Sequence, residues 1–218
     1  MAEPKPVALI TGGTTGIGLA TAQLLHADGF AVVVTGRDPH TLAGAAAALP
    51  DDALVLKADA RVLADADVVA DTVRERFGRL DVVFLNAGVG RFVPIDAVDE
   101  ATYDDMFAVN VKGQFFTLQR VLPLLASGGS VVVSAALGAE LGLPDWSIYS
   151  ATKGALVAAV RALAVELAPA GIRVNAVSAG PVRTPALGKL GLPVESADVE
   201  KGMAAGIPIG RIGEAEDV

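Results

Sequence analysis

The stretch PVALITGGTTGIGLATAQLLHA, residues 6–27, joins a short apolar run to a helical pattern through a loop rich in glycine. The apolar run at 6–11, closed by glycines, predicts a buried strand, and the apolar period at 17–27 predicts a helix. Glycines at such a corner let the backbone turn tightly and approach a pyrophosphate, whose charge is favoured by the first helical amides. Gly12, Gly16 and Gly18 do not have the G-x-G-x-x-G spacing, and a plain tight turn is the alternative. The strand–loop–helix context favours a dinucleotide site.

The same two patterns alternate along the rest of the chain, which predicts an α/β fold. Parallel strands joined by helices form right-handed crossovers, with helices on both faces of the sheet. No linker, tandem repeat or low-complexity tract divides the alternation, so residues 1–218 are expected to form one domain. The expected strands are 6–11, 31–35, 53–57, 81–85, 130–133 and 172–177, and the expected helices are 17–27, 41–49, 63–77, 101–125 and 149–167.

Composition and charge argue against several classes of protein. The net charge of −8 disfavours broad binding of nucleic acid. Apolar runs stop far short of the roughly 18 residues that span a bilayer, and the N-terminal residues lack a basic segment followed by a long apolar one. Cysteine is absent, and His26 and His40 lie in polar surroundings, which disfavours a metal site or a serine–histidine nucleophile. We therefore expect a cytoplasmic protein with no metal, nucleic-acid or membrane partner.

Arg37 stands where the second expected strand ends, about 20 residues after the glycine loop. At this turn an acidic side chain would hold the free 2′-hydroxyl of NAD. The chain instead reads VVVTGRDPH, with Gly36 and Arg37 at the turn, and the planar guanidinium of Arg37 suits the 2′-phosphate of NADP. The alternative is an ordinary solvated arginine that is neutralised by Asp38. The sequence favours NADP over NAD.

Tyr149 and Lys153 lie four residues apart in the last expected helix and so share one of its faces. An ammonium beside a phenol is expected to lower the tyrosine pKa from about 10, which would make Tyr149 a general acid or base. Such pairs also occur on solvated helices. Alanine and valine fill the rest of this helix, which indicates burial on more than one side, either under the sheet or at a subunit interface.

Several motifs in order resemble the short-chain dehydrogenase/reductase family over nearly the whole chain. They are Thr11-Gly12-x-x-x-Gly16-x-Gly18, Asp59 after the third strand, Asn86-Ala87-Gly88 after the fourth, Asn110 in VNVKG, Tyr149-x-x-x-Lys153, and Gly180 with Thr184 in AGPVRT. The resemblance implies a Rossmann-type, doubly wound parallel sheet that binds NAD(P). It also implies hydride transfer between the nicotinamide and the carbonyl or alcohol carbon of a small substrate.

The resemblance further implies roles for these residues. Tyr149 would transfer the proton, and Lys153 would bind the nicotinamide ribose and lower the tyrosine pKa. Asn110 would support a water relay beyond Lys153, although a polar residue that bends a long helix is a compatible alternative. The implied cofactor contacts are Gly12, Gly16 and Gly18 at the pyrophosphate with Ile17 beside them, Asp59 at the adenine, Asn86, Ala87 and Gly88 at the adenosine ribose, and Gly180 and Thr184, with Thr184 at the nicotinamide amide.

Position 136 departs from the family, in which a serine thirteen residues before the tyrosine hydrogen-bonds the substrate oxygen. Ala136 and its neighbour Ala135 carry no hydroxyl. Ser134 would lie on the same side of a regular strand, but about 6.6 Å away along it, and Ser147 would need a loop that folds inward. Losing one donor from an oxyanion site costs roughly 10² to 10³ in rate, which weakens an enzyme without necessarily abolishing its activity.

Two functions follow from this departure. The first is an NADP-dependent reductase or dehydrogenase whose substrate oxygen is held mainly by Tyr149. The second is an NADP(H)-binding protein with weak or no catalysis, acting as a sensor or partner because position 136 is alanine. Turnover across a panel of carbonyl and alcohol compounds would separate the two.

The C-terminal part of the chain carries further expectations. Residues 185–210 are rich in glycine and apolar, which predicts a mobile lid over an apolar substrate, or a plain connection with a short helix. The ending RIGEAEDV resembles the start of a late family helix that is followed by one more strand, so the sheet is expected to lack its last strand and leave an open edge. The family also forms homodimers or homotetramers through two long helices, here 101–125 and 149–167. Trp146 would line the substrate pocket or pack in the core.

Overall fold

Six parallel strands form the central sheet of the structure, a computed structural model that describes residues 5–187 and 197–218. The strand order is β3-β2-β1-β4-β5-β6, so the direction of winding reverses between β1 and β4. The carboxyl ends of strands on either side of such a reversal form the crevice in which doubly wound folds bind their ligands. The strands are β1 Val7–Ile10, β2 Ala31–Gly36, β3 Leu54–Lys57, β4 Leu80–Leu85, β5 Leu125–Ser134 and β6 Arg173–Val177.

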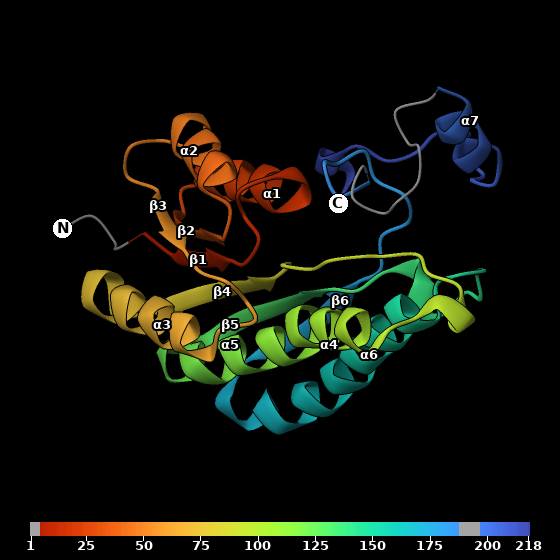
Figure 1. The fold of residues 1–218 in the computed structure, drawn as a ribbon. Helices are drawn as coiled ribbons and strands as arrows, with labels where there is room; N and C mark the ends of the chain where they lie inside the picture. The colour runs from red at the N-terminus through yellow and green to blue at the C-terminus, as the bar shows by residue number, and fades with distance from the viewer. Residues whose placement is uncertain (1–4, 188–196) are drawn as a thin grey trace.

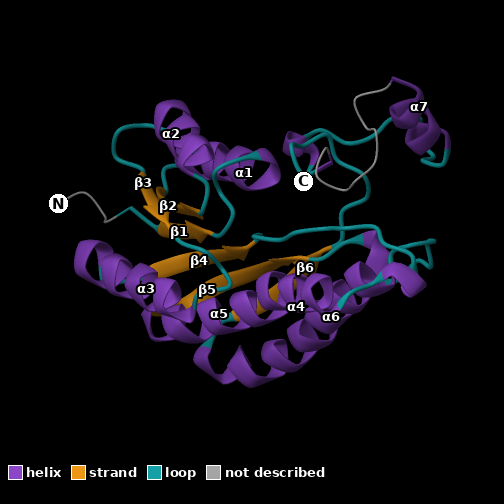
Figure 2. Cartoon of the chain, in the orientation of Figure 1, coloured by secondary structure: helices purple, strands orange, loops and turns teal. Residues whose placement is uncertain are grey.

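Helices cover both faces of this sheet (Figures 1 and 2). Two lie on one face, α1 Gly16–Ala27 and α2 Pro39–Ala48. The opposite face carries α3 Leu63–Phe77, α4 Glu100–Phe107, α5 Gln114–Val121 and α6 Ser147–Leu167. The short helix α7, Ala197–Ala205, lies away from the sheet on the side of the C-terminus. These layers and the strand order are those of the Rossmann-type fold that the sequence predicts.

The core follows from the alternation of side chains along the buried strands. In β1, Leu9 faces the layer beneath α3, α5 and α6, while Ala8 and Ile10 face α1, and all three side chains are fully buried. Strands of a parallel sheet are covered on both faces, so nearly every residue of these short runs is apolar. The clean apolar runs in the sequence are thus the signature of a sheet between two helical layers.

The expected helix 101–125 is interrupted in the structure. Between α4 and α5 the backbone forms a π-helical turn, Ala108–Gly113, and α5 ends at Val121. Pro123, in the short 3-10 turn that follows, cannot donate the next helical hydrogen bond, which helps to end the helix. Leu125 belongs to β5, so the prediction that the helix extends to residue 125 is wrong.

Helix α6 is buried along one side only, whereas its composition predicts burial on more than one. Thr152, Lys153 and Leu156 face inward, while Ala158 and Val165 are exposed, Val165 to 77%. Among the described helices, the segment Ser147–Ala170 is long and apolar enough to cross a membrane by length and composition alone, and 22% of its most apolar window is buried. Helix α6 thus presents polar residues such as Thr152 and Lys153 to the interior and apolar residues such as Val165 to the surface.

The described C-terminal part leaves β6 as an edge strand, which pairs with β5 and exposes Arg173 and Asn175. Of the segment 185–210 that the sequence marks as a lid, residues 188–196 lie outside the described residues, and α7 forms the part that follows. A parallel bridge between Val182 and Gly213 brings the two ends of this segment together.

Candidate active site

The sequence motifs converge at the carboxyl ends of β1, β4, β5 and β6, where the loops that leave these strands meet (Figure 1). In open α/β sheets this edge is where ligands bind. The residues gathered here come from positions as far apart as Gly12 and Thr184.

The glycine loop is closely covered by two other motifs. Gly12 has a φ of +62°, and a Cβ atom built on it would lie 2.8 Å from Cα of Ala87. Gly16 has a φ of +52°, and its Cβ would lie 2.9 Å from Cγ2 of Thr184. A Cβ on Gly18 would lie 2.4 Å from the carbonyl oxygen of Gly12. The backbone can follow this path only because these three residues lack a side chain.

Thr11 fixes the loop after β4 against the glycine loop. Its hydroxyl accepts hydrogen bonds from the amides of Asn86 and Ala87 at 2.9 and 3.0 Å. The side-chain amide of Asn86 donates to the carbonyls of Thr11 and Gly12, both at 3.2 Å. The chain therefore builds the entrance to α1 as one hydrogen-bonded unit.

This entrance fits the pyrophosphate of a dinucleotide. The side chain of Thr15, the N-cap residue of α1, makes no capping hydrogen bond, so the helix start is not closed by its own cap. Ile17 lies in the first turn and is half-buried. Bare glycine backbone together with an uncapped helix start is the donor set that binds phosphate oxygens.

Arg37 lies where the ribose of an adenosine would be read, at the end of β2. Its side chain is half-exposed, and its Nη1 atom lies 3.8 Å from Oδ2 of Asp59. Gly36, just before it, has no room for a side chain because a Cβ there would lie 2.6 Å from Cγ2 of the buried Thr14. An acidic side chain at position 36 is thereby excluded unless Thr14 moves, which leaves Arg37 as the polar group at this turn.

Asp59 is more strongly engaged with its own neighbours than the sequence suggests. Its carboxylate accepts the Nε of Arg61 at 3.0 Å and the backbone amide of Arg61 at 3.0 Å, and the hydrogen bond from the Arg61 side chain holds the pKa of Asp59 below its usual value. Arg61 also reaches Asp105 at 3.1 Å. The expected adenine contact would therefore be made by a carboxylate already bound to an arginine.

Asn110 sits in the π-helical turn and joins three elements. Its Oδ1 accepts the amide of Val89 at 2.8 Å, and its Nδ2 donates to the carbonyl of Val89 at 2.8 Å and to the hydroxyl of Thr152 at 3.0 Å. The side chain is fully buried. Turns of this kind inside α-helices occur frequently at functional sites. Asn110 thus bends the helix, as one alternative predicts, and also faces the site.

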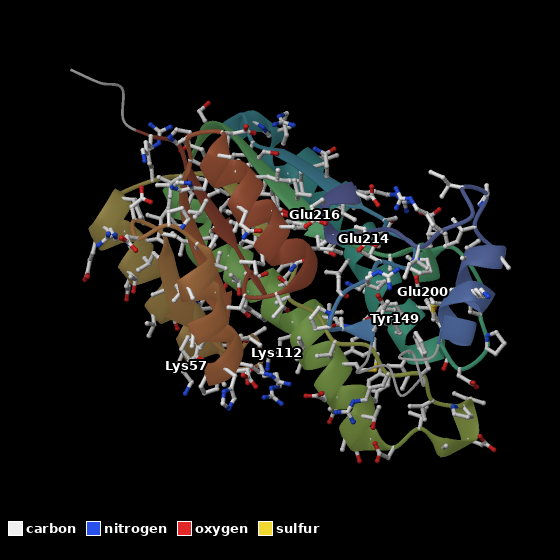
Figure 3. The ribbon with its side chains drawn as sticks, turned by 90° about the horizontal axis from the view of Figure 1, so that it is seen from above. Lys57, Lys112, Tyr149, Glu200, Glu214 and Glu216 are labelled. Atoms are coloured by element: carbon white, nitrogen blue, oxygen red, sulfur yellow. The ribbon has the colours of Figure 1, made fainter. Side chains whose placement is uncertain are left out.

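Tyr149 and Lys153 come from the same face of α6, and Figure 3 labels Tyr149 on that helix. The Nζ atom of Lys153 lies 5.8 Å from the centre of the Tyr149 ring and donates to the carbonyl of Ser134 at 2.7 Å. A Cβ on Gly88 would lie 3.6 Å from this Nζ and 3.4 Å from Oδ1 of Asn110. The structure brings these four residues together.

Burial dominates the pKa values of this pair. Removal from water disfavours the charged form of each side chain, so it raises the pKa of Tyr149 to about 12 and lowers the pKa of Lys153 to about 8. The sequence predicts that Lys153 lowers the tyrosine pKa below its ordinary value. In the structure, burial of the phenol raises the tyrosine pKa by more than the nearby ammonium lowers it.

Ala136 is buried and extended, with a φ of −165° and a ψ of 157°. The chain leaves the regular strand just before Ala136. There the amide of Ala135 donates to the carbonyls of both Val133 and Val177. Ser134 presents its carbonyl, rather than its hydroxyl, to Lys153. Ser147 is exposed on the first turn of α6.

Sequence reasoning missed an aromatic group beside Tyr149. The ring of Phe92 stacks on Trp146 with centroids 4.3 Å apart, and both rings stand edge-on to Tyr149, at 6.3 and 5.5 Å. Trp146 can lie flat here because a Cβ on Gly138 would come within 2.9 Å of its ring. Phe92 stands in no recognisable motif, and only its place after the Asn86-Ala87-Gly88 loop could have drawn attention to it.

Gln114 is a second residue that the sequence did not single out. It is 2% exposed on α5, its Oε1 lies 3.1 Å from the hydroxyl of Thr11, and its Nε2 donates to the carbonyl of Ala87. Gln114 therefore ties α5 to the same unit that Thr11 builds between β1 and β4.

A cavity of about 750 Å³ opens between the loop after β4 and the connection from β5 to α6. Its described lining consists of residues 94–96, 138–145, 147 and 150. Ser147 and Ser150 belong to α6 on either side of Tyr149. The cavity therefore reaches the first turn of α6, on which Tyr149 also lies, while Tyr149 itself is not part of the described lining.

The segment after β6 completes the site. Thr184 touches the glycine loop at Gly16, and Gly180 packs near Leu137, 3.3 Å from its Cδ1 if a Cβ is added. Arg183 pairs with Glu200 of α7 and, at 3.0 Å, with Glu214, both labelled in Figure 3. Arg183 thus connects the residues before the glycine-rich segment 185–210 with α7 inside it and with Glu214 after it.

Comparison with known proteins agrees with this geometry. Residues 12–218 match the family model described as enoyl-(acyl carrier protein) reductase. An uncharacterised oxidoreductase of Methylorubrum extorquens is 37% identical over 97% of this chain and 86% of its own length. The crystal structure of a 3-ketoacyl-(acyl-carrier-protein) reductase from Brucella melitensis, complexed with NADH, has a TM-score of 0.88 at 30% identity, covering 97% of this chain and 86% of that one.

A second solved structure contains the other nicotinamide cofactor. It is a short-chain dehydrogenase from Burkholderia cenocepacia in complex with NADP, with a TM-score of 0.85 at 31% identity and the same coverage of 97% and 86%. The family match extends over nearly all of the chain, and these relatives are described as an oxidoreductase, a reductase and a dehydrogenase, the solved ones with the same fold. The chain therefore belongs to the short-chain dehydrogenase/reductase family of oxidoreductases.

Proposed function

We propose that this oxidoreductase is an NADP-dependent reductase or dehydrogenase, acting on a carbonyl or alcohol compound with Tyr149 as general acid or base. The observation that carries the proposal is the pair of half-buried Tyr149 and buried Lys153, of which Lys153 lies beside Gly88 and Asn110. Side chains that burial forces to titrate away from their ordinary values gather preferentially at functional sites.

The cofactor would supply or accept the hydride, and the chain's own residues manage the proton. In the reducing direction the Tyr149 hydroxyl gives its proton to the substrate oxygen, and in the oxidising direction it takes that proton back. A pKa of about 12 keeps the phenol protonated at neutral pH, as reduction requires. Lys153, with a pKa of about 8, is the neighbouring group that can return a proton to Tyr149, with Asn110 as the next polar group behind it.

Residues of the glycine loop and its neighbours would hold the cofactor. Gly12, Gly16, Ile17 and Gly18 would bind the pyrophosphate through backbone amides at the start of α1. Lys153 would bind the nicotinamide ribose, since its Nζ adjoins the loop at Gly88. The remaining proposed contacts are Asp59, Asn86, Ala87, Gly88, Gly180 and Thr184.

NADP is preferred to NAD in this proposal because of the turn after β2. Gly36 leaves no space for an acidic side chain that would bind a free ribose hydroxyl. The guanidinium of Arg37 is half-exposed and lies 3.8 Å from Asp59. It can therefore turn toward a phosphate and give up its weak ion pair with Asp59.

The substrate oxygen would be held mainly by Tyr149, because Ala136 offers no hydroxyl. This arrangement costs roughly 10² to 10³ in rate relative to a site with a second donor. The same observation supports a second candidate, an NADP(H)-binding protein with weak or no catalysis that serves as a sensor or partner. Sustained turnover by the unmodified chain would exclude that candidate.

We further propose that the chain works in the cytoplasm as a homodimer or homotetramer, with residues 185–210 as a substrate lid. The exposed apolar row of α6, which includes Val165, is the kind of surface that a second copy covers. Phe115 on α5 and Tyr103 on α4, two helices on the same face of the sheet as α6, are each 46% exposed. A monomer in sedimentation at micromolar concentration would contradict the assembly.

The deciding experiment is a titration with NADPH and NADH followed by a panel of carbonyl and alcohol compounds. We expect tighter binding of NADPH and turnover of at least one compound. Tyr149→Phe should bind NADPH normally and lose turnover, since it removes the transferable proton while keeping the ring. Unchanged turnover in Tyr149→Phe would refute the role of the tyrosine.

A further inference from the structure

We propose that the cavity at the start of α6 selects substrates whose apolar body carries no negative charge, and excludes anionic ones. This inference rests on the proposed function and adds the class of substrate. The excluded class contains simple keto acids and also thioesters carried on phosphopantetheine or coenzyme A, because their phosphates are negatively charged. The cavity in question is the space of about 750 Å³ lined by residues 94–96, 138–145, 147 and 150.

The position of the cavity makes it the place for the body of a substrate. It opens at the carboxyl edge of the sheet, between the segments that leave β4 and β5. Gly138 in its wall contacts the ring of Trp146, whose centroid lies 5.5 Å from that of Tyr149. A compound seated in the cavity would thus lie against the wall that Gly138 forms with Trp146, whose ring stands edge-on to Tyr149.

The lining includes large apolar side chains that meet solvent. Ile95, Leu141 and Leu143 are 77%, 53% and 46% exposed, although each is a large aliphatic side chain. Pro94 and Pro144 stand beside them in the same lining. Large apolar side chains that stay exposed around one hollow mark a surface that a ligand covers.

The charged side chains of the described lining are all negative. Asp96, Glu140 and Asp145 belong to the lining, and none of its described members is a lysine, arginine or histidine. No ion pair found among residues 5–187 and 197–218 joins any of the three carboxylates to a basic group. Arg91 is the basic residue nearest in sequence to lining residues 94–96, and it pairs instead with Asp105 at 3.8 Å. An anion entering the cavity therefore meets uncompensated like charge.

Two contacts join the segments that form the wall of the cavity. Asp145 has a φ of 65°, in the left-handed region, and its carbonyl accepts the amide of Val93 at 2.9 Å. This hydrogen bond joins the two segments that line the cavity, and the stack of Phe92 on Trp146 lies beside it. The backbone that carries the three carboxylates is thus held around one cavity.

The test uses Trp146 as the reporter, because it is the single tryptophan of the chain. The probes are three 4-aryl-2-butanones that differ only at the para position, which carries a methyl, a carboxylate or a trimethylammonium group. With NADP⁺ saturating, we expect the methyl and ammonium probes to change the Trp146 fluorescence, and the carboxylate probe to bind on the order of tenfold more weakly. This difference should shrink in 1 M salt, where the Debye length falls to about 3 Å.

Neutralising the carboxylates should remove the discrimination. In the combined variant Asp96→Asn, Glu140→Gln and Asp145→Asn, the ratio of methyl-probe to carboxylate-probe affinity should fall toward one. Asparagine is chosen at position 145 because it tolerates a positive φ. The matched control is Glu75→Gln on the exposed surface of α3, at the opposite end of the sheet, where the ratio should not change. Thermal melting establishes that both variants are folded.

Each outcome bears on the inference. If the carboxylate probe binds the unmodified chain as tightly as the methyl probe, if no probe changes the fluorescence, or if the folded combined variant keeps the original ratio, the inference is wrong. Failure of the proposed function has a different signature, because the probes would then bind in the expected order of charge while NADPH reduces none of them. Reduction of all three ketones with equal kcat/KM would preserve the proposed function and overturn the charge selection.

Discussion

The ammonium of Lys153 is held by the backbone carbonyl of Ser134, 2.7 Å away, so the candidate lysine is positioned by the end of β5 and not by a side chain. A carbonyl acceptor is present whatever residue occupies position 134. The lysine can therefore keep its place even though the neighbouring position 136 carries no hydroxyl. The departure at Ala136 is local, and it leaves the rest of the group intact.

Replacing Lys153 with methionine should stabilise the chain at neutral pH. The pKa of Lys153 falls from 10.5 to about 8 on burial, so the unfolded chain holds more protons than the folded one between these values. Unmodified protein therefore gains stability as the pH rises through this window, and the cost of the buried charge is largest below it. We expect Lys153→Met to raise the free energy of unfolding by about 1 to 3 kcal/mol at pH 7 and by less at about pH 9.5.

Urea denaturation at the two pH values measures this effect. A gain that is equal at both values would show that the methionine acts through packing and not through the removed charge. The variant should also lose turnover, which separates the demands of stability from those of the site.

Adding the missing hydroxyl should increase the rate. Ala136 is 8% exposed and extended next to the site, and serine differs from alanine by one oxygen. If position 136 faces the substrate oxygen, Ala136→Ser should raise kcat/KM on the order of 10- to 100-fold by providing a second donor. Ala135→Ser is the matched control. The side chain at position 135 leaves the backbone in another direction from the one at position 136, so this variant should bring no gain.

Steady-state kinetics on one identified ketone measures both variants. No gain in Ala136→Ser, with NADPH binding intact, would mean that a different group already supplies the donor or that the chain does not catalyse the reaction.

Removing the charge of Arg37 should affect only the phosphorylated cofactor. We expect Arg37→Gln to weaken NADPH binding by roughly 10- to 100-fold while NADH binding stays nearly constant, because hydrogen bonds to a charged group contribute about 1.5 to 3 kcal/mol. Calorimetric titration of both cofactors checks this. Arg76→Gln, on the exposed surface of α3, is the control and should bind both as before. Equal weakening for NADPH and NADH would contradict phosphate recognition.

Two helical glycines should respond oppositely to alanine. A Cβ on Gly18 would lie 2.4 Å from the carbonyl oxygen of Gly12 and 2.6 Å from Nδ2 of Asn86, so Gly18→Ala must push the glycine loop apart. We expect a loss of about 1 to 3 kcal/mol in stability and a loss of dinucleotide binding. Gly44 in α2 has nothing within 4 Å of its Cβ position, and Gly44→Ala should add about 0.5 to 1 kcal/mol. Thermal melting measures both variants. If their melting temperatures shifted in the same direction relative to the unmodified chain, this prediction would be wrong.

Much of the fold was accessible from the sequence, because short apolar runs and helical periods alternate without interruption. The boundaries that moved have a local cause. The helix expected at 101–125 contains a π-helical turn at Ala108–Gly113 and ends before Pro123. Apolar period alone does not distinguish a π turn from a continuous helix, since the row of side chains resumes after the extra residue.

The candidate site was only partly accessible. Motif residues such as Gly12 and Asn86 were found because their types and order are distinctive, and the structure brings them into contact. Phe92 and Gln114 were missed because an aromatic and an amide at those positions carry no local signal, and their partners lie 54 and 103 residues away. The tyrosine pKa was mispredicted because spacing places the ammonium nearby but says nothing of how deeply the phenol is buried.

The contact between Gly36 and Thr14 limits the order in which mutations can accumulate in this protein. A change of cofactor preference through an acidic residue at position 36 would first place its Cβ 2.6 Å from Cγ2 of Thr14. A smaller residue at position 14 must therefore arise before, or together with, the acidic one. Thr14 is itself buried and within 3.1 Å of the Thr41 hydroxyl, so that first step carries a cost of its own. The preference for one nicotinamide cofactor would thus be protected by epistasis, and a library that varies positions 14 and 36 jointly should recover switched variants that single-site libraries miss.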